Sequence, residues 1–209
     1  MSDLKLHTYK VGELQTNCYI VSQDNKCLIF DPGDSADFIL EKLLIEKLTP
    51  IAIFSTHGHF DHTLAVGEIQ LSFDIPYFIS KKDLFLLNRS KETADYFLKG
   101  MQVVIPPKNI EDLKGGKLKV GNFEFEVIRT PGHTPGSTCF KFEDFVLTGD
   151  TLFKGTVGRY DFSYSDKKLL KDSIERLFNL PEGTIVYPGH EDETLIGTEM
   201  RNKLFSLIF

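Results

Sequence analysis

The sequence predicts an α/β protein with a single domain, in which two similar halves pack sheet on sheet with helices outside. Its 209 residues suffice for one sizeable domain, and no stretch rich in proline, serine or charge resembles a linker. Short strand-like runs precede a helical segment in the first half, and the same order returns in the second. A hydrophobic fraction of 41% is ordinary for a chain with a packed core.

The first half opens with a predicted hairpin. Residues 17–34, "NCYIVSQDNKCLIFDPGD", place two β-branched apolar runs around a polar turn, and we interpret the final "DPGD" as turn chemistry. Residues 36–48 have helical spacing, which Pro50 ends. Residues 50–56, "PIAIFST", form a continuous apolar run typical of a buried strand.

The next segments predict a helix, a strand and an insertion. Residues 63–73 return to helical spacing, and residues 75–80, "IPYFIS", indicate a strand. Residues 81–114 contain helical patches and a Pro-Pro break without a chemical cluster. We interpret them as a helical insertion that lines a pocket.

The second half repeats the strand-then-helix order. Strand-like patterns cover residues 117–130 and 138–150, the latter with a hairpin turn at Glu143 and Asp144. A helix is predicted over about 166–179, followed by a strand at 184–187 and a last helix from about 194.

Charge and hydropathy exclude several classes of protein. The 24 Lys and Arg against 30 Asp and Glu leave a net charge of −6, so we expect no nucleic-acid partner. The first residues, "MSDLKLHTYKVGEL", lack the apolar core of a signal peptide. No apolar run approaches the roughly 18 residues that a membrane span needs. These features predict a cytoplasmic protein without membrane contact.

The three cysteines, Cys18, Cys27 and Cys139, lie in apolar strand-like runs and are odd in number. This argues against a disulfide framework and favours buried thiols in a reducing compartment. Because Cys18 and Cys27 flank the predicted hairpin turn, a redox-sensitive pair stays open as the alternative.

Histidines and aspartates concentrate in loops that follow predicted strands. Every histidine among the six except His7 lies in such a loop, in "STHGHFDH", "TPGHTPGS" or "YPGHED", and "LTGD" adds an aspartate. Loops at one edge of a sheet can aim side chains at a common point, so we expect these groups to converge. The candidates are His57, His59, Asp61, His62, His133, Asp150 and His190.

Seven candidate ligands are more than one tetrahedral zinc ion accepts, and they suit two metals that share a carboxylate. Two simpler interpretations are also compatible with this pattern. The histidines could be surface loop residues with the aspartates as turn formers or caps, or the site could be structural zinc, which favours cysteine ligands. A serine hydrolase is not predicted, because no G-x-S-x-G elbow is present.

Four motifs, "THGHFDH", "PGHTPGS", "TGDTLF" and "YPGHED", occur in this order over nearly the whole chain. Together they resemble the metallo-β-lactamase superfamily, and within it they look most like the glyoxalase II (hydroxyacylglutathione hydrolase) branch. The resemblance implies a four-layer αββα sandwich with the site at one edge of the sheets. Few residues follow His190, so the resemblance is closer to short, single-domain members than to two-domain enzymes whose C-terminal helices bind glutathione.

The resemblance also implies a role for each site residue. His57, His59 and His133 would hold metal 1, Asp61, His62 and His190 would hold metal 2, and Asp150 would bridge both. The segment "GDTLFKGTVGRYDF" resembles the part that contacts the thiol-bearing product, which implies substrate contacts for Arg159 and Tyr160, with Lys154 nearby. For Arg159 the alternative is a surface ion pair.

The expected function is a binuclear metal-dependent thioesterase. Two divalent ions, zinc in the first place and iron or manganese as alternatives, would generate a bridging hydroxide that Asp61 helps to orient. The hydroxide would cleave S-2-hydroxyacyl glutathione or a related small acyl thioester. The alternatives are a persulfide dioxygenase with one iron, a superfamily hydrolase of lactones or phosphodiesters, and a non-catalytic metal-binding protein. We expect a monomer or homodimer, whose apolar segment 200–209 docks on the core or on a second subunit.

Overall fold

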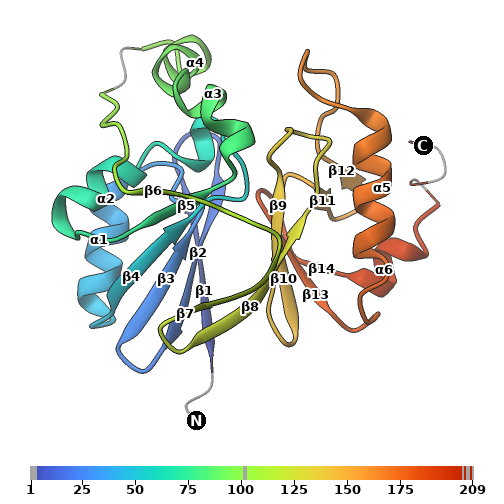
Figure 1. The fold of residues 1–209 in the computed structure, drawn as a ribbon, viewed down its shortest axis with the longest axis horizontal. Coiled ribbons are helices and arrows are strands. Elements are labelled where there is room, and N and C mark those ends of the chain that lie inside the picture. Colours follow the sequence, from blue (N-terminus) through green and yellow to red (C-terminus); the bar gives the residue numbers. More distant parts are fainter. Residues whose placement is uncertain (1–3, 101–102, 204, 206–207, 209) are drawn as a thin grey trace.

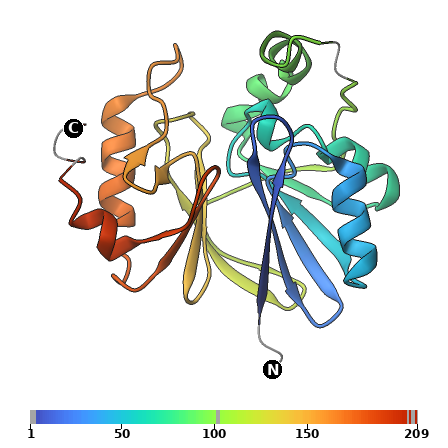
Figure 2. The same cartoon turned by 180° about the vertical axis from the view of Figure 1, so that it is seen from behind.

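The computed structural model describes residues 4–100, 103–203, 205 and 208, and it has the predicted four layers. Two six-stranded sheets face each other, with α1 (Ala36–Ile45) and α2 (Val66–Ser72) outside the first and α5 (Lys167–Leu177) and α6 (Ile196–Met200) outside the second (Figures 1 and 2). The structure confirms the predicted αββα sandwich.

The first sheet has the strand order β1-β2-β3-β4-β5-β6. Its first three strands are antiparallel, and β3 to β6 run parallel to one another. The parallel strands therefore end at one common edge of the sheet. The strands are β1 (Lys5–Val11), β2 (Thr16–Gln23), β3 (Lys26–Phe30), β4 (Thr49–Phe54), β5 (Tyr77–Ile79) and β6 (Ile110–Asp112).

The second sheet has the order β14-β13-β10-β9-β8-β7. The antiparallel β9 separates β8 from β10, and β10 pairs in parallel with β13, so β8, β10 and β13 all end at the same edge. The strands are β7 (Gly116–Val120), β8 (Phe123–Arg129), β9 (Thr138–Lys141), β10 (Phe145–Gly149), β13 (Ile185–Pro188) and β14 (Thr194–Leu195), beside a small hairpin of β11 (Leu152–Phe153) and β12 (Thr156–Val157).

The apolar core lies in three layers. Phe30 and Phe54 of the first sheet meet Phe125 and Phe140 of the second, with ring centroids between 4.9 and 6.1 Å apart across the sheets. Two further clusters pack α1 and α2 onto the first sheet, and α5 and α6 onto the second. Aromatic burial is the largest contribution a core of this size can draw on, which explains the many phenylalanines.

The predicted insertion, residues 81–114, contains helices as expected and one unexpected strand. It forms the 3-10 turn η2 (Lys81–Asp83), then α3 (Leu84–Leu87) and α4 (Ser90–Phe97); a separate 3-10 turn, η1 (Phe60–His62), precedes α2. These helices lie above the strand ends (Figure 1). The insertion also contributes β6, which was not predicted, because a three-residue edge strand leaves no periodicity to read.

The cysteines are buried free thiols, as expected. Cys27 pairs with Ser22 in the β2–β3 hairpin, whereas Cys18 pairs with Tyr9 of β1. The proposed cross-strand pair of Cys18 and Cys27 is therefore not formed, because the two residues occupy different positions in the register.

One expectation concerns the C-terminal end of the chain. Of the apolar segment 200–209, Phe205 packs in the cluster beneath α5, with its ring centroid 5.3 Å from that of Phe178, which agrees with docking on the core. Residues 1–3, 204, 206, 207 and 209 lie outside the described part.

Within the described part, the helices are all too short or too polar to cross a bilayer.

Candidate metal centre

The sheet topology explains why the predicted ligands meet. The loops after β4, β8, β10 and β13 lie at the shared edge of the sandwich, and each carries histidine or aspartate. Close approach of the loops requires glycine at two places. Gly149, before Asp150, has φ +50° and packs on Thr56, while a Cβ on Gly189 would lie 2.3 Å from Asp150 Oδ1.

Four residues form the first group of potential metal ligands, which we call group A: His57, His59, His133 and Asp150. His59 Nδ1 lies 2.9 Å from His57 Nε2 and 3.0 Å from His133 Nε2. Asp150 Oδ2 is 3.5 Å from His133 Nε2. Nitrogen and oxygen atoms at these spacings can share one ion.

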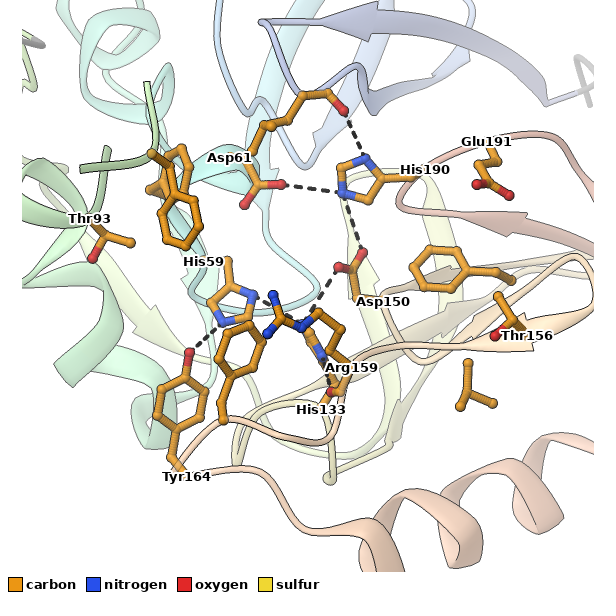
Figure 3. Close-up of a pocket in the computed structure, with 16 residues that line it drawn as sticks. His59, Asp61, Thr93, His133, Asp150, Thr156, Arg159, Tyr164, His190 and Glu191 are labelled. Carbon is orange, nitrogen blue, oxygen red and sulfur yellow. Dashed lines mark hydrogen bonds and ion pairs between the residues drawn. The ribbon is translucent and has the colours of Figure 1, made fainter. Parts of the chain in front are cut away.

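The second group, group B, contains Asp61, His62 and His190. Asp61 Oδ2 lies 3.2 Å from His190 Nε2 and 3.6 Å from His62 Nε2. Asp150 turns its other oxygen, Oδ1, toward this group, at 3.3 Å from His62 and 3.8 Å from His190 (Figure 3). The Asp150 carboxylate thus faces group A with one oxygen and group B with the other.

The outward ring nitrogens of these histidines also have partners. In group A, His133 Nδ1 donates to the Arg159 carbonyl at 2.7 Å, His59 Nε2 lies 2.8 Å from the Tyr164 hydroxyl, and His57 Nδ1 lies 3.1 Å from Thr56 Oγ1. In group B, His190 Nδ1 donates to the Leu14 carbonyl and His62 Nδ1 contacts Asp31. Such outer partners fix the tautomer and leave the inner nitrogens free to bind metal.

The inner atoms fit metal ions better than they fit one another. With their outer nitrogens protonated, the group A imidazoles bring lone pairs within 3.0 Å, which is repulsive unless a cation lies among them. Both ring nitrogens of His62 and Asp150 Oδ1 are buried and make ion-pair contacts only, without a hydrogen-bond partner in the described structure. Buried polar atoms rarely stay unsatisfied, so the donor set fits bound cations.

The electrostatics favour the metal-binding protonation state in group A. Burial and then repulsion from His133 lower the pKa of His59 to about 3, and burial together with His62 and His59 holds the pKa of His57 well below its usual value. Burial would raise the pKa of Asp150, but His62 beside it brings that pKa well below the ordinary range. Neutral imidazoles and a charged carboxylate are the forms that bind metal.

Group B concentrates negative charge. Burial would lower the pKa of His62, but Asp61, Asp150 and Asp31 raise it well above the usual value. Burial likewise opposes the raised pKa of His190, to which Asp61 contributes most. The carboxylates therefore favour positive charge at this point, as a metal ion would supply it.

Two buried aspartates that hold the ligand loops were not among the predicted site residues. Asp31, interpreted as turn chemistry, accepts hydrogen bonds from Thr56 N (2.7 Å) and Thr56 Oγ1 (2.8 Å) and contacts His62 at 3.1 Å. Its position directly after a strand, like that of the ligands, was the signal available for it. Asp83, in the insertion, carried no such signal.

Asp83 connects the two loops of group A. It accepts hydrogen bonds from Gly58 N (2.9 Å) in one loop, and from Gly136 N (2.7 Å) and Thr134 Oγ1 (2.6 Å) in the other. Its side chain is fully buried, and burial raises its pKa although these donors stabilise the charged form. Asp83 therefore fixes the distance between the loops of His59 and His133.

A pocket of about 420 Å³ opens onto the centre. Both groups reach its floor, and as expected the insertion contributes to its wall, through Thr93 and Phe97 of α4 (Figure 3). The complete lining is Leu14, His59, Phe60, Asp61, Thr93, Phe97, His133, Asp150, Phe153, Thr156, Val157, Arg159, Phe162, Tyr164, His190 and Glu191.

The three predicted substrate contacts separate in the structure. Arg159 lines the pocket and also forms the ion pair weighed as its alternative, with Asp161. Neither Lys154 nor Tyr160 is among the lining residues: Lys154 Nζ lies 3.9 Å from Asp192, and Tyr160 lies beneath the Lys167 ammonium at 5.2 Å. Tyr164, which was not predicted, lines the pocket instead, because the loop after Arg159 turns back over His59.

Comparison with known proteins defines the class. Residues 11–190 match the profile of the metallo-β-lactamase superfamily, and the chain belongs to this superfamily. The crystal structure of the BLEG-1 B3 metallo-β-lactamase has a TM-score of 0.89 at 35% identity, covering 97% of this chain and 100% of that one. TTHA1623, solved in a di-iron-bound form, has a TM-score of 0.86 at 35% identity, with 94% and 98% covered.

Two relatives are named by their activity. YqgX of Bacillus subtilis, a probable metallo-hydrolase, is 37% identical over 205 residues, which cover 97% of each chain. The hydroxyacylglutathione hydrolase GloC of Haemophilus influenzae is 33% identical over 208 residues, covering 97% of this chain and 98% of the relative. The chain is thus similar to metallo-hydrolases over nearly its whole length.

Proposed function

We propose that the protein is a binuclear metal-dependent hydrolase of acyl thioesters. The observation that carries the proposal is the position of Asp150, whose two oxygens face two separate groups of ligands. A carboxylate shared in this way is the usual bridge of a two-metal hydrolytic site. The similarity to GloC supports a thioester as the substrate.

In this proposal group A would hold metal 1 and group B would hold metal 2, with Asp150 available to both. Imidazole and carboxylate ligands suit zinc, iron and manganese. Zinc is the metal expected from the motifs, and the di-iron form of TTHA1623 supports iron as the alternative. When bound, two divalent ions lower the pKa of water toward about 7 and polarise a carbonyl oxygen.

The chain's own residues prepare the nucleophile and its target. Asp61 lines the pocket beside His190, so its carboxylate can orient the attacking water and accept its proton. The outer partners of the histidines keep each ring in one orientation, which preserves the geometry during turnover. The apolar pocket wall limits the number of competing water molecules near the acyl carbon.

A thioester suits this arrangement because its leaving group needs little help. The water oxygen adds to the acyl carbon, the carbon–sulfur bond breaks, and the sulfur leaves with the bonding pair as a thiolate. A thiol has a pKa of about 8.5, so the thiolate departs without a strong general acid. An amide nitrogen would need a proton donor at the same point.

The test combines metal analysis with a thioester panel. We expect two metal equivalents per chain and hydrolysis of acyl thioesters, which falls about 10²- to 10⁴-fold in Asp61→Ala. Asp172→Ala, on the exposed face of α5, is the matched control and should retain full activity. Failure of fully metal-loaded protein to hydrolyse any thioester would contradict the proposal. One iron per chain with oxygen uptake on a persulfide would indicate a dioxygenase instead.

A further inference from the structure

The pocket above the metal centre has a mostly apolar wall. Its side chains come from the loop after β1, from η1, from α4 and from the segment after Asp150, and Phe97 is 49% exposed at the rim. A ligand that covers Phe97 would gain the free energy of burying its ring. The apolar lining residues are Leu14, Phe60, Phe97, Phe153, Val157 and Phe162.

Beyond the potential metal ligands, the lining residues include two charged ones, Arg159 and Glu191. One edge of the Arg159 guanidinium is paired: Nε and Nη2 donate to the two carboxylate oxygens of Asp161, each at 2.9 Å. Its carbon atom Cζ also lies 4.4 Å from the centre of the Phe162 ring (Figure 3 shows Arg159 within the pocket). The cation is thus held in the wall with its charge matched.

This charge pattern disfavours an anionic thiol carrier. A glutathione thioester has two carboxylates, each of which needs a cation or several amide donors to leave water. The lining offers one arginine, and the Asp161 carboxylate already balances its charge. Glu191, the other charged residue of the lining, adds repulsion toward a carboxylate of the thiol carrier.

Uncharged polar groups of a ligand match the pocket lining better than carboxylates do. The hydroxyls of Tyr164, Thr93 and Thr156 line the same pocket and can pair with amide or ether groups. A neutral amide loses less hydration free energy in an apolar pocket than a carboxylate does. The wall is therefore suited to a neutral ligand with a large apolar group.

We propose that the preferred substrate is a thioester that joins an apolar acyl group, aromatic or branched, to an uncharged thiol, rather than a hydroxyacyl glutathione. This inference rests on the proposed function and specifies its substrate class. The apolar wall selects the acyl group, and the Arg159–Asp161 pair together with Glu191 selects against charge on the thiol.

Four probes separate the two parts of the proposal. Phenylacetyl and lactoyl groups are each joined to N-acetylcysteamine and to glutathione, and kcat/KM is measured with the metal-loaded protein. We expect the phenylacetyl ester to exceed the lactoyl ester of the same thiol about 10- to 100-fold, as burial of one aromatic ring allows. We expect N-acetylcysteamine esters to exceed glutathione esters of the same acyl group, with a difference that shrinks at high salt.

Variants test each wall. Phe97→Ala should lower kcat/KM for the phenylacetyl esters about 10-fold and change the lactoyl esters little. Asp161→Asn should raise the ratio of glutathione to N-acetylcysteamine ester hydrolysis, because it frees the Arg159 cation and removes a carboxylate. The matched control is Glu124→Gln, which removes one charge from an exposed ion pair with Lys119 on the second sheet and should leave the ratio unchanged.

The outcomes distinguish the two levels of proposal. If lactoylglutathione is the best of the four, or if Asp161→Asn leaves the ratio unchanged, the substrate inference is wrong while the thioesterase function stands. If no probe is hydrolysed by protein that contains two metal equivalents, both are wrong.

Discussion

At the scale of single residues, the contact between His59 and Tyr164 shows how this chain completes its centre. The two residues are 105 positions apart, and the Tyr164 hydroxyl lies 2.8 Å from the outer nitrogen of His59. Burial raises the pKa of Tyr164 to about 12, so the hydroxyl stays neutral. It can therefore accept the His59 proton and hold Nδ1 toward the other histidines of group A.

Substitution of Tyr164 should weaken metal binding in group A. In Tyr164→Phe the outer N–H of His59 loses its acceptor, and we expect metal affinity to fall about 10- to 100-fold at one of two sites. Competition with a chromophoric chelator measures both affinities. Tyr160→Phe, whose ring lies outside the pocket lining, is the control and should bind metal like the parent. Equal affinities in both variants would show that the hydroxyl has no positioning role.

Site residues that local sequence spacing reveals differ physically from those that only long-range contacts bring to the site. His57, His59, Asp61 and His62 share one short loop, and their spacing alone indicates chelation. Tyr164 acts only because a loop folds back over His59, and no local pattern records such a contact. Periodicity and spacing do not reveal side chains that contact the ligand histidines only because distant segments of the chain pack together.

At the scale of elements, η2 is the piece that unites the loops of group A. Its last residue, Asp83, accepts hydrogen bonds from the loop after β4 and from the loop after β8. A Cβ on Gly136 would lie 2.5 Å from the Asp83 carboxyl carbon, so the loop and the carboxylate are in close contact. The insertion is thus part of the scaffold of the centre as well as a wall of the pocket.

Removal of the Asp83 carboxylate should affect both stability and metal content. In Asp83→Ala the amides of Gly58 and Gly136 lose their acceptor, and we expect the free energy of unfolding to fall by about 2 to 4 kcal/mol. Metal analysis should show preferential loss from group A. Urea unfolding and metal stoichiometry are compared with Asp37→Ala, at an exposed position in α1. Parent-like values for both quantities would refute the connecting role.

Most elements that the sequence patterns missed are short strands with distant partners, although β1, with seven residues beside β2, was missed as well. β6 pairs with β5 across more than thirty residues, and β14 has two residues. Neither shows alternation long enough to identify, whereas α1 and α5 follow a helical period over ten and eleven residues. Length of the periodic pattern thus separates most elements that could be predicted from those that could not, whereas β1 is long enough but its sequence, KLHTYKV, does not alternate regularly.

At the scale of the whole molecule, both ligand groups join the two halves of the sandwich. Group A takes His57 and His59 from the first half and His133 from the second, and group B takes His62 and His190 likewise. A metal bound in either group would therefore cross-link the sheets, and its binding free energy would add to the stability of the folded state.

Metal removal should lower the thermal stability markedly. At a free metal concentration about 1,000 times Kd, binding contributes about 4 kcal/mol, which for a chain of this size corresponds to a Tm shift of roughly 8 to 16 °C. Calorimetry before and after dialysis against EDTA measures the shift, and returning zinc should restore the original Tm. The same Tm shift is measured for His190→Ala before and after chelation. The difference between the shifts of the parent and of this variant gives the part due to group B. A Tm that does not change on chelation would contradict the cross-link.

The loop that carries His190 is also held by protein contacts alone. Asn17 of β2 donates from its side-chain amide to the Pro188 and Glu191 carbonyls, and its own backbone N–H donates to the Gly189 carbonyl. The Tyr19 hydroxyl donates to Pro188 as well. These bonds join the first sheet to the second beside the pocket, so separating the two halves to admit a substrate would break all of them. A substrate would instead enter over the pocket rim, to which α4 contributes Thr93 and Phe97.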